Sequence, residues 1–280
     1  MGISPKRVLK ELFYVGLEFL PLSLQKRYWL MIEAKSKNND KRLSADEWGE
    51  LYNIKSLESV VNRIVKGHVS EHSHEMLKLT KPGERILEIG VGSGQTSLWL
   101  AKHGRLVTGI DFSNNAIRLF SEAAEQLNIP VQAVQVDAEK PLPFEENEFD
   151  WVFQAGLLEH FHLEERIRLL QQWGKYTRGM ISFIPNAASV IYRYGKARQE
   201  YLGTWKYGLE MPQYSLAGEF AAAGFSLEAE YTFDLKTPLD FLPRFHYLRR
   251  VFRRLQRDGF LADNCGQGYL LATVGKKKQQ

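Results

Sequence analysis

The sequence predicts an α/β fold in which a doubly wound parallel sheet follows a helical N-terminal lobe. From Pro82 and Gly83 onward, short apolar runs alternate with segments of helical periodicity. This pattern is typical of a parallel sheet covered by helices on both faces. Residues 1–80 show helical spacing without such alternation. The chain has 280 residues, 44% of them hydrophobic and 25% charged, so it is long enough for one large core with an appended lobe.

The helical lobe is expected to span residues 1–80. Apolar residues recur at helical spacing from 8 to 19 and continue from 28 to 32. Ser44 and Glu47 match a capping box, which predicts that another helix begins there. We therefore expect several helices before the core.

The core is expected to span residues 81–280, and nothing in it marks a second independent domain. Its candidate strands are the short apolar runs at 85–89, 106–110, 131–136, 151–154, 180–184, 226–234 and 269–274. Its candidate helices lie at 96–102, 116–127, 163–173 and 215–223.

Charge and cysteine content limit the classes of function. The net charge is only +4, which is weak support for a nucleic-acid-binding protein, so nucleic acid is not an expected partner. The one cysteine, Cys265, excludes an internal disulfide and any multi-cysteine metal site. Such sparing use of cysteine fits a reducing compartment, so we expect a cytoplasmic protein.

A glycine-rich turn joins the first strand of the core to the following helix. Gly90, Gly92 and Gly94 are spaced G-x-G-x-G, and glycine lets the backbone turn tightly and approach a ligand closely. The helix that follows offers free backbone N–H groups at its start. In the dinucleotide pattern G-x-G-x-x-G the third glycine would stand at position 95, where this sequence has Gln. This difference weakens the interpretation of the turn as a nicotinamide- or flavin-dinucleotide site.

Three carboxylates accompany the first three strands and make the glycine turn more specific than it is alone. Glu88 lies two residues before the glycines, where it would disfavour a pyrophosphate but suit a cationic amino-acid ligand. Asp111 ends the second strand, at a place where an acid can accept hydrogen bonds from both ribose hydroxyls. Asp137 ends the third strand, where it can accept from an exocyclic amine.

These motifs together resemble the class I S-adenosylmethionine-dependent methyltransferases, most closely their small-molecule branch. The matching segments are 86–94, 109–113, 137–152 and 158–160. The resemblance is dense over residues 85–185. It implies a Rossmann-like, seven-stranded sheet whose last strand is antiparallel, and S-adenosyl-L-methionine as the cofactor.

The resemblance also implies which residues bind that cofactor. They are Glu88, Gly90, Gly92, Gly94, Asp111, Phe112, Asp137, Ala138, Gln154 and Tyr52. The glycines would lie under the methionine part, Asp111 at the ribose, and Asp137 and Ala138 at the adenine. Phe112 would stack near the adenine, and Gln154 would flank the site through its backbone. Tyr52 and Trp48 are similar to the family's N-terminal lid, with core packing as the alternative.

His160 is the candidate catalytic base. Methyl transfer is an in-line displacement, so the main task of the protein is to place a nucleophile behind the methyl group. A base is needed only if the acceptor loses a proton. His160 follows the fourth strand at the rim where substrate enters such folds. The alternative is a helix-start histidine without chemistry, and His162 is the second choice.

A histidine-rich stretch precedes the core. His68, His72 and His74 stand with Glu71 and Glu75, and the first two are four residues apart, a spacing that can chelate one ion on a helix. The H-E-x-x-H order is absent and no distant ligand is evident. We therefore expect a polar helix face beside the lid and no metal.

Two insertions are expected to cover the acceptor, near 186–212 and 236–260. Within the second, the spacing predicts one basic amphipathic helix over 241–257. Its apolar stripe would be Phe241, Phe245, Leu248, Phe252 and Leu255, and its basic face Arg250, Arg253, Arg254 and Arg257. We hypothesise transient contact with an anionic membrane surface. A solvated basic face, an acidic acceptor and RNA are the alternatives.

The sequence therefore indicates a methyltransferase that modifies a small-molecule acceptor at O, N or C. We hypothesise that this acceptor is hydrophobic or membrane-associated. Three alternatives stay open: an RNA methyltransferase, a protein methyltransferase, and a non-catalytic binding protein that keeps the fold. The fourth strand ends in Gln154-Ala-Gly-Leu rather than the N-P-P-aromatic signature of base amino-group methylation. Acceptor pockets come from variable segments rather than shared motifs, so the acceptor is not named.

Overall fold

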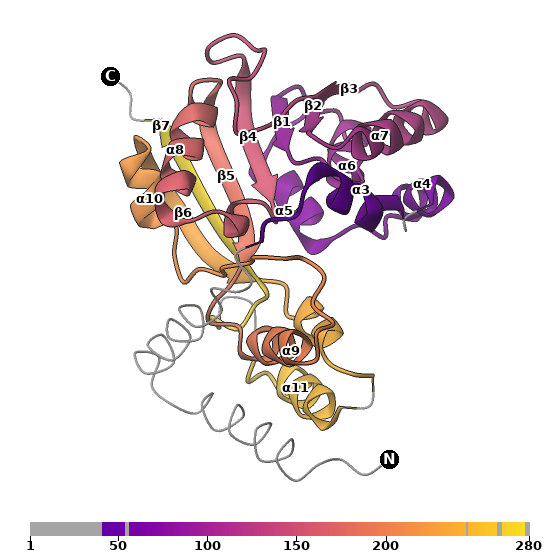
Figure 1. Cartoon of the computed structure of the whole chain (residues 1–280), viewed down its shortest axis with the longest axis vertical. Helices are drawn as coiled ribbons and strands as arrows, with labels where there is room; N and C mark the ends of the chain where they lie inside the picture. The colour runs from indigo at the N-terminus through magenta and orange to yellow at the C-terminus, as the bar shows by residue number, and fades with distance from the viewer. Residues whose placement is uncertain (1–40, 54–55, 245, 262–264, 278–280) are drawn as a thin grey trace.

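The computed structural model describes residues 41–53, 56–244, 246–261 and 265–277 (Figure 1). Its centre is one seven-stranded sheet in the order β3-β2-β1-β4-β5-β7-β6. The strands are β1 (Arg85–Ile89), β2 (Leu106–Asp111), β3 (Gln132–Gln135), β4 (Phe149–Ala155), β5 (Thr177–Pro185), β6 (Phe225–Phe233) and β7 (Leu270–Lys277). β7 pairs antiparallel with both β5 and β6, and the other pairs are parallel. The expected Rossmann-like sheet with an antiparallel last strand is confirmed.

Helices cover both faces of this sheet. The helices of the described chain are α3 (Ala45–Asn53), α4 (Leu57–Lys66), α5 (Glu71–Leu79), α6 (Gln95–Lys102), α7 (Asn114–Leu127), α8 (Leu163–Gly174), α9 (Val190–Tyr201), α10 (Ala217–Ala222) and α11 (Tyr247–Arg257), with short 3₁₀ turns η2 (Leu158–His160) and η3 (Thr237–Phe241). Side chains of α8 and α10 pack on one face, and those of α5 and α6 on the other. Successive residues of β1, such as Ile86 and Leu87, are buried toward opposite faces because neighbouring side chains of a strand point to opposite sides.

The helical character of the N-terminal region is confirmed where the structure describes it. At the start of α3, the backbone N–H of Ser44 donates to Glu47 Oε2 (2.8 Å) and the N–H of Glu47 donates to Ser44 Oγ (3.3 Å), the reciprocal bonds of a capping box. The helical spacing expected at 8–19 and 28–32 lies outside the described residues. In the described part of the chain, no helix is both long and apolar enough to cross a membrane.

The single helix expected over 241–257 is wrong. Instead, η3 ends at Phe241 and α11 begins at Tyr247. Between them lies Pro243, which has no N–H to donate to a continuous helix. The imidazole of His246 caps the new start by accepting from Leu248 N. Phe245 lies outside the described residues, so the expected apolar stripe is only partly placed.

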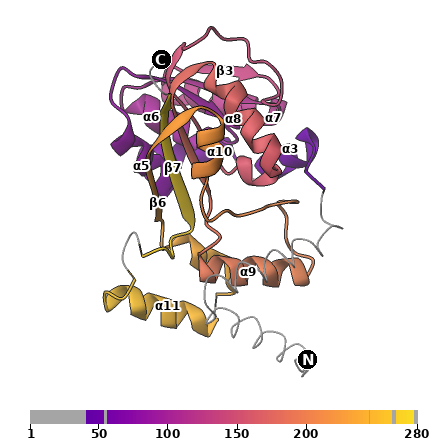
Figure 2. The ribbon, with the colours of Figure 1, turned by 90° about the vertical axis from the view of Figure 1, so that its left-hand side faces the viewer.

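The elements α9, η3 and α11 form a small lobe beyond the carboxyl ends of the parallel strands (Figures 1 and 2). Its centre is apolar and contains Ile191, Tyr194, Leu239, Leu242 and Phe252. The chain enters α9 directly after β5. The lobe therefore stands at the edge of the sheet where ligands bind in open α/β folds.

Candidate active site

The glycine turn after β1 adopts the backbone that its sequence predicts. Gly90, Gly92 and Gly94 have φ angles of 74°, 52° and 70°, in the left-handed region that favours glycine. Gly94 is the N-cap of α6, and a Cβ there would overlap the ring of Phe120. Gly94 is thus required by packing, whereas Gly90 and Gly92 line cavities.

Two cavities open at the carboxyl ends of β1 and β4, where the strand order reverses. The first, of about 250 Å³, lies around the glycine turn; the second, of about 230 Å³, lies beside the ends of β2 and β3. Gly90 and Ala155 line both. The two cavities therefore adjoin at the topological switch point, the usual ligand crevice of such a sheet.

The first cavity carries one buried acid and one guanidinium. Burial raises the pKa of Glu88 from an ordinary 4.5 to about 8, although two hydrogen bonds from Ser97 to Glu88 Oε2 oppose the shift. Arg63 of α4 lines the same cavity, and its Nε donates to the carbonyl of His68 (3.0 Å). Sequence analysis missed Arg63 because no motif surrounds it.

Asp111 fixes the glycine turn against the end of β2. Its Oδ2 accepts from the N–H of Gly92 and its Oδ1 from the N–H of Ser113, both at 2.9 Å. Burial raises the pKa of Asp111, and these bonds to the charged form work against that shift. The carboxylate also lines the second cavity, as does the neighbouring Phe112.

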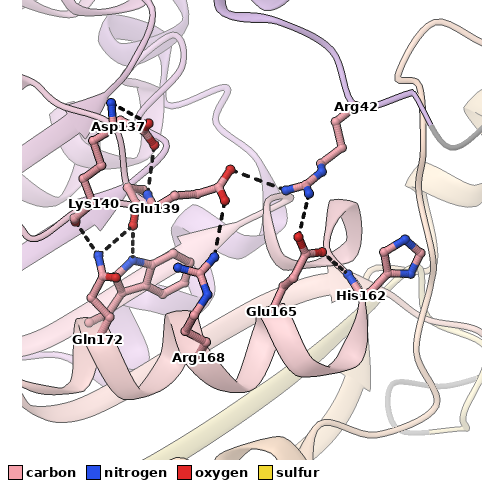
Figure 3. Close-up of polar contacts among 10 residues, drawn as sticks. Arg42, Asp137, Glu139, Lys140, His162, Glu165, Arg168 and Gln172 are labelled. Atoms are coloured by element: carbon pink, nitrogen blue, oxygen red, sulfur yellow. Dashed lines mark hydrogen bonds and ion pairs between the residues drawn. The ribbon is translucent and has the colours of Figure 1, made fainter.

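The loop after β3 brings Asp137 and Ala138 to the second cavity. Hydrogen bonds from side chains of α8 hold this loop in place. The Trp173 indole donates to the Ala138 carbonyl (2.9 Å), and Asp137 Oδ1 accepts from the N–H of Glu139 (2.9 Å). Figure 3 shows Asp137, Glu139 and Gln172 joined in this network. These bonds pre-organise the loop before any ligand binds.

Arg42 closes one side of the second cavity and was not expected from the sequence. Its guanidinium pairs with Glu165 of α8 (2.6 Å) and Glu139 of the β3 loop (3.4 Å), as Figure 3 shows. It also lies over the ring of Phe161, 4.8 Å from the centroid. Arg42 and Trp48, both lining this cavity, connect the segment around α3 to the core.

Gln154 lines neither cavity. Its Oε1 accepts from the N–H of Leu157 (2.8 Å) and of Leu158 (3.3 Å), and its amide donates to Ser182 Oγ. The side chain thereby anchors the turn that carries Gly156 and Leu157, two residues of the cavity wall. The side chain of Tyr52 lies outside what the structure describes.

His160 lies in η2 and lines the second cavity. Burial lowers its pKa, although the backbone carbonyl of Leu209, bonded to Nδ1, favours the charged ring. A neutral ring that donates from Nδ1 has an unprotonated Nε2, so the tautomer inferred from this bond is a base. Trp48 packs edge-on against the imidazole, with 5.2 Å between ring centroids. His162, by contrast, is exposed at the N-cap of α8.

Behind His160 lies a buried polar group that sequence analysis did not anticipate. The Tyr192 hydroxyl donates to Glu210, and burial raises the pKa values of both. Burial also raises the pKa of Glu159 well above its ordinary value, and Oε2 of Glu159 has no partner among the described residues. Met211 N donates to the Glu159 carbonyl (2.8 Å). Residues 209–211 are therefore fastened to η2 on both sides of Glu210.

The histidine-rich stretch does not form a metal site. His68 lies after the end of α4 and His72 lies within α5, so the two do not share a helix. Among the residues the structure describes, no group of three His, Cys, Asp or Glu side chains could hold a metal ion. His72 instead lines the first cavity and bonds to Ser70 Oγ (3.0 Å).

Residues 86–178 match the family model described as a methyltransferase domain. The chain contains a class I S-adenosylmethionine-dependent methyltransferase domain. The match begins in β1 and ends in β5, so it includes the glycine turn, Asp111, Asp137 and His160.

Curated relatives of this methyltransferase domain include a ubiquinone biosynthesis O-methyltransferase of Coxiella burnetii, 32% identical over 120 residues, or 42% of this chain and 47% of the relative. An S-adenosyl-L-methionine-dependent Diels-Alderase, iccD of Talaromyces variabilis, is 30% identical over 113 residues, or 38% of this chain and 39% of the relative. The chain therefore spans about half or less of the length of these curated relatives.

Among solved structures, the magnesium protoporphyrin IX methyltransferase of Synechocystis PCC 6803 with bound SAH has a TM-score of 0.51 to this chain. The two share 16% identity over 83% of this chain and 93% of that one. At this level of identity the likeness concerns the fold, which extends well beyond the matched methyltransferase domain.

Proposed function

We propose that this chain transfers the methyl group of S-adenosylmethionine to a small, largely apolar acceptor. One observation carries the proposal: the paired cavities at Gly90 and Ala155 differ in chemistry. The first offers an acid and a guanidinium, which match the ammonium and carboxylate of an amino acid. The second offers carboxylates among apolar walls, which match a nucleoside.

The residues present fit the cofactor part by part. Glu88 would receive the ammonium and Arg63 the carboxylate of the methionine portion. Asp111 would accept from the ribose hydroxyls and Asp137 from the exocyclic amine of the adenine, with Phe112 beside the ring. Gly90 and Gly92 leave room for the ligand because they carry no side chain. When bound, the cofactor supplies an activated methyl group and its leaving group.

His160 would act on the acceptor. Its neutral ring, oriented by the Leu209 carbonyl, has Nε2 ready to take the proton from an acceptor hydroxyl or amine as the new bond to methyl forms. Burial, which lowers the pKa of His160, keeps this base form at neutral pH. An acceptor that needs no deprotonation would use the same site by proximity alone.

The acceptor is proposed to be a small molecule. Support comes from the O-methyltransferase among the partial relatives. We propose that residues 1–80 act as a lid on a core of 81–280, and that segments near 186–212 and 236–260 cover the acceptor. The single exposed cysteine supports a cytoplasmic location.

The decisive experiment is calorimetry of the full chain with S-adenosylhomocysteine. Wild type should bind, whereas Gly92→Val should not, because a side chain at φ 52° would distort the turn and fill the cavity. Gly218→Ala, a glycine with open space around it, is the matched control and should bind normally. A wild-type chain that does not bind would leave a non-catalytic protein that only keeps the fold.

Transfer itself is then tested with methyl-labelled cofactor against phenolic, amine and RNA or protein acceptors. With the true acceptor, His160→Gln should lower turnover on the order of 10²-fold while affinity for S-adenosylhomocysteine stays close to wild type. Labelling of RNA or protein in place of small molecules would overturn the acceptor class. An unchanged rate in the variant would remove His160 as a base.

A further inference from the structure

Helix α11 presents three different faces. One is packed into the lobe through Phe252, which is buried beside Ile191 and Leu239. The second carries four arginines that are all exposed: Arg250, Arg253, Arg254 and Arg257. The third is an exposed apolar stripe at a spacing of four residues, with Tyr247 55%, Val251 48% and Leu255 37% exposed, continued by Phe260 at 74%.

The apolar stripe is not explained by packing within the lobe. Residues spaced by four lie along one side of a helix, so Tyr247, Val251 and Leu255 form a continuous strip. The lobe already buries the adjacent face of α11 through Phe252. Within the described residues, the strip remains in contact with water, which is unfavourable for apolar surface.

The basic face is largely uncompensated. In the described part of the chain, neither Arg250 nor Arg253 has an ion-pair partner. Arg254 and Arg257 share one carboxylate, that of Asp258, each at 3.3 Å. The helix itself contains no acidic residue. The surface therefore joins several positive charges to an apolar strip that runs beside them.

We propose that α11 docks this protein on an anionic lipid bilayer, lying flat in the interface. The strip of Tyr247, Val251 and Leu255 would enter the boundary between headgroups and acyl chains, and the arginines would meet the lipid phosphates. A nucleic acid would use the arginines but leave the apolar strip in water, so the combination of both faces favours lipid.

The position of α11 would place the docked bilayer close to the two cavities. α11 belongs to the lobe beyond the carboxyl ends of the strands, the same edge of the sheet as the two cavities (Figure 2). A bilayer bound there would lie on the cavity side of the molecule rather than behind the sheet. A hydrophobic acceptor could then reach the site from the lipid phase. This last step rests on the proposed function, but the docking itself does not.

The test is co-sedimentation of the full chain with vesicles of phosphatidylcholine alone or mixed with phosphatidylglycerol, at low and high salt. Binding should require the anionic lipid and fall at least about tenfold as salt rises, because salt screens charge at a surface. Replacing the four arginines by Gln should reduce binding at least about tenfold. Arg118→Gln with Arg178→Gln, two exposed arginines outside the lobe, is the control and should bind as wild type.

A second variant separates lipid from other anionic partners. Val251→Ser with Leu255→Ser keeps every charge and removes two of the three apolar side chains of the strip, so it should also reduce vesicle binding. Equal binding by this variant, or tight binding to RNA without binding to anionic vesicles, would overturn the proposal. Affinity for S-adenosylhomocysteine, measured in parallel, should be unchanged in both variants, which keeps this test independent of the catalytic proposal and reports that each variant is folded.

Discussion

Glu88 is a carboxyl group whose protonation should follow the occupancy of its cavity. Buried beside the glycine turn, it has a pKa of about 8, so it is mostly neutral at pH 7 in the free protein. A bound ammonium would favour the charged form and lower this pKa. Binding at neutral pH should therefore release a proton from Glu88.

We expect the affinity of the wild-type chain for S-adenosylhomocysteine to rise with pH up to about 8, because only ionised Glu88 can pair with the ammonium. The limiting slope is about tenfold per pH unit below the pKa. Glu88→Gln should bind more weakly at pH 8 and show little pH dependence. Calorimetry in buffers of different ionisation enthalpy measures both the affinity and the released proton. A wild-type affinity that is flat from pH 6 to about 8 would contradict this role.

The same residue should make stability depend on pH. The folded pKa of Glu88 lies above its unfolded value, so its favourable contribution is complete below about 4.5 and is lost as pH rises toward about 8. In that window each pH unit should cost the wild type on the order of 1 kcal/mol relative to Glu88→Gln. Thermal melts of both proteins across this pH window should show that the stability of the variant increases relative to that of the wild type as pH rises. A constant difference would mean that Glu88 is ionised throughout.

At the level of elements, the junction of β1, the glycine turn and α6 depends on close packing as well as on ligand access. We expect Gly94→Ala to destabilise the fold by about 2–4 kcal/mol, because its φ of 70° and its contact with Phe120 both exclude a Cβ. Gly218→Ala, in α10 with open space, should instead be neutral or stabilising by up to about 1 kcal/mol. Urea denaturation of the two variants compares these costs. Equal stability would show that α7 moves to make room.

The sheet was predictable from the sequence because most of its parallel strands, β1, β2, β4 and β5, are buried apolar runs beside a turn or helix signal. β1 was predicted over its full length, and β2 differs only by Asp111. β4 and β5 extend farther than expected because pairing continues past the apolar runs, for example between Phe149 and Thr177. The prediction of one helix over 241–257 was wrong because it followed the apolar spacing and overlooked Pro243. Proline has no N–H to donate, so a continuous helix is interrupted there.

The site was only partly predictable. Phe112, Asp137 and Ala138 follow strands β2 and β3, so their place at the second cavity follows from topology. Arg42 and Arg63 reach the cavities from helices and loops far away in sequence, and no local pattern distinguishes them from other surface arginines. Long-range contacts of this kind depend on tertiary packing, which residue spacing does not encode.

At the level of the whole molecule, the site joins distant parts of the chain. Arg42 and Trp48 come from the segment before the core. Glu88 and Gly92 belong to the first strand and its turn. Leu209, in a later insertion, contacts His160 through its backbone carbonyl. The sheet provides the floor, and the segments before and after it provide the walls. Ligand binding should therefore stabilise segments well outside the matched domain, residues 86–178.

We expect S-adenosylhomocysteine to slow amide hydrogen exchange together in residues 41–53, 90–97 and 155–161, because all three contribute to one joined site. Exchange in α11, which lines neither cavity, should stay unchanged and serves as the internal control. Mass spectrometry of peptides from the full chain measures these rates. Protection confined to 90–97 would show that the segment around α3 does not take part in binding.

The ion pairs of Arg42 with Glu139 and Glu165 concern the rate at which a ligand leaves the site rather than its affinity. They are partly exposed and join the segment before α3 to the β3 loop and α8, beside the second cavity. If the second cavity holds the adenosine part of the cofactor, as proposed, a product that leaves on this side would first have to break both ion pairs. Surface ion pairs weaken as ionic strength rises. The dwell time of the product, and with it the interval between one turnover and the next, would then be set by the salt around the protein.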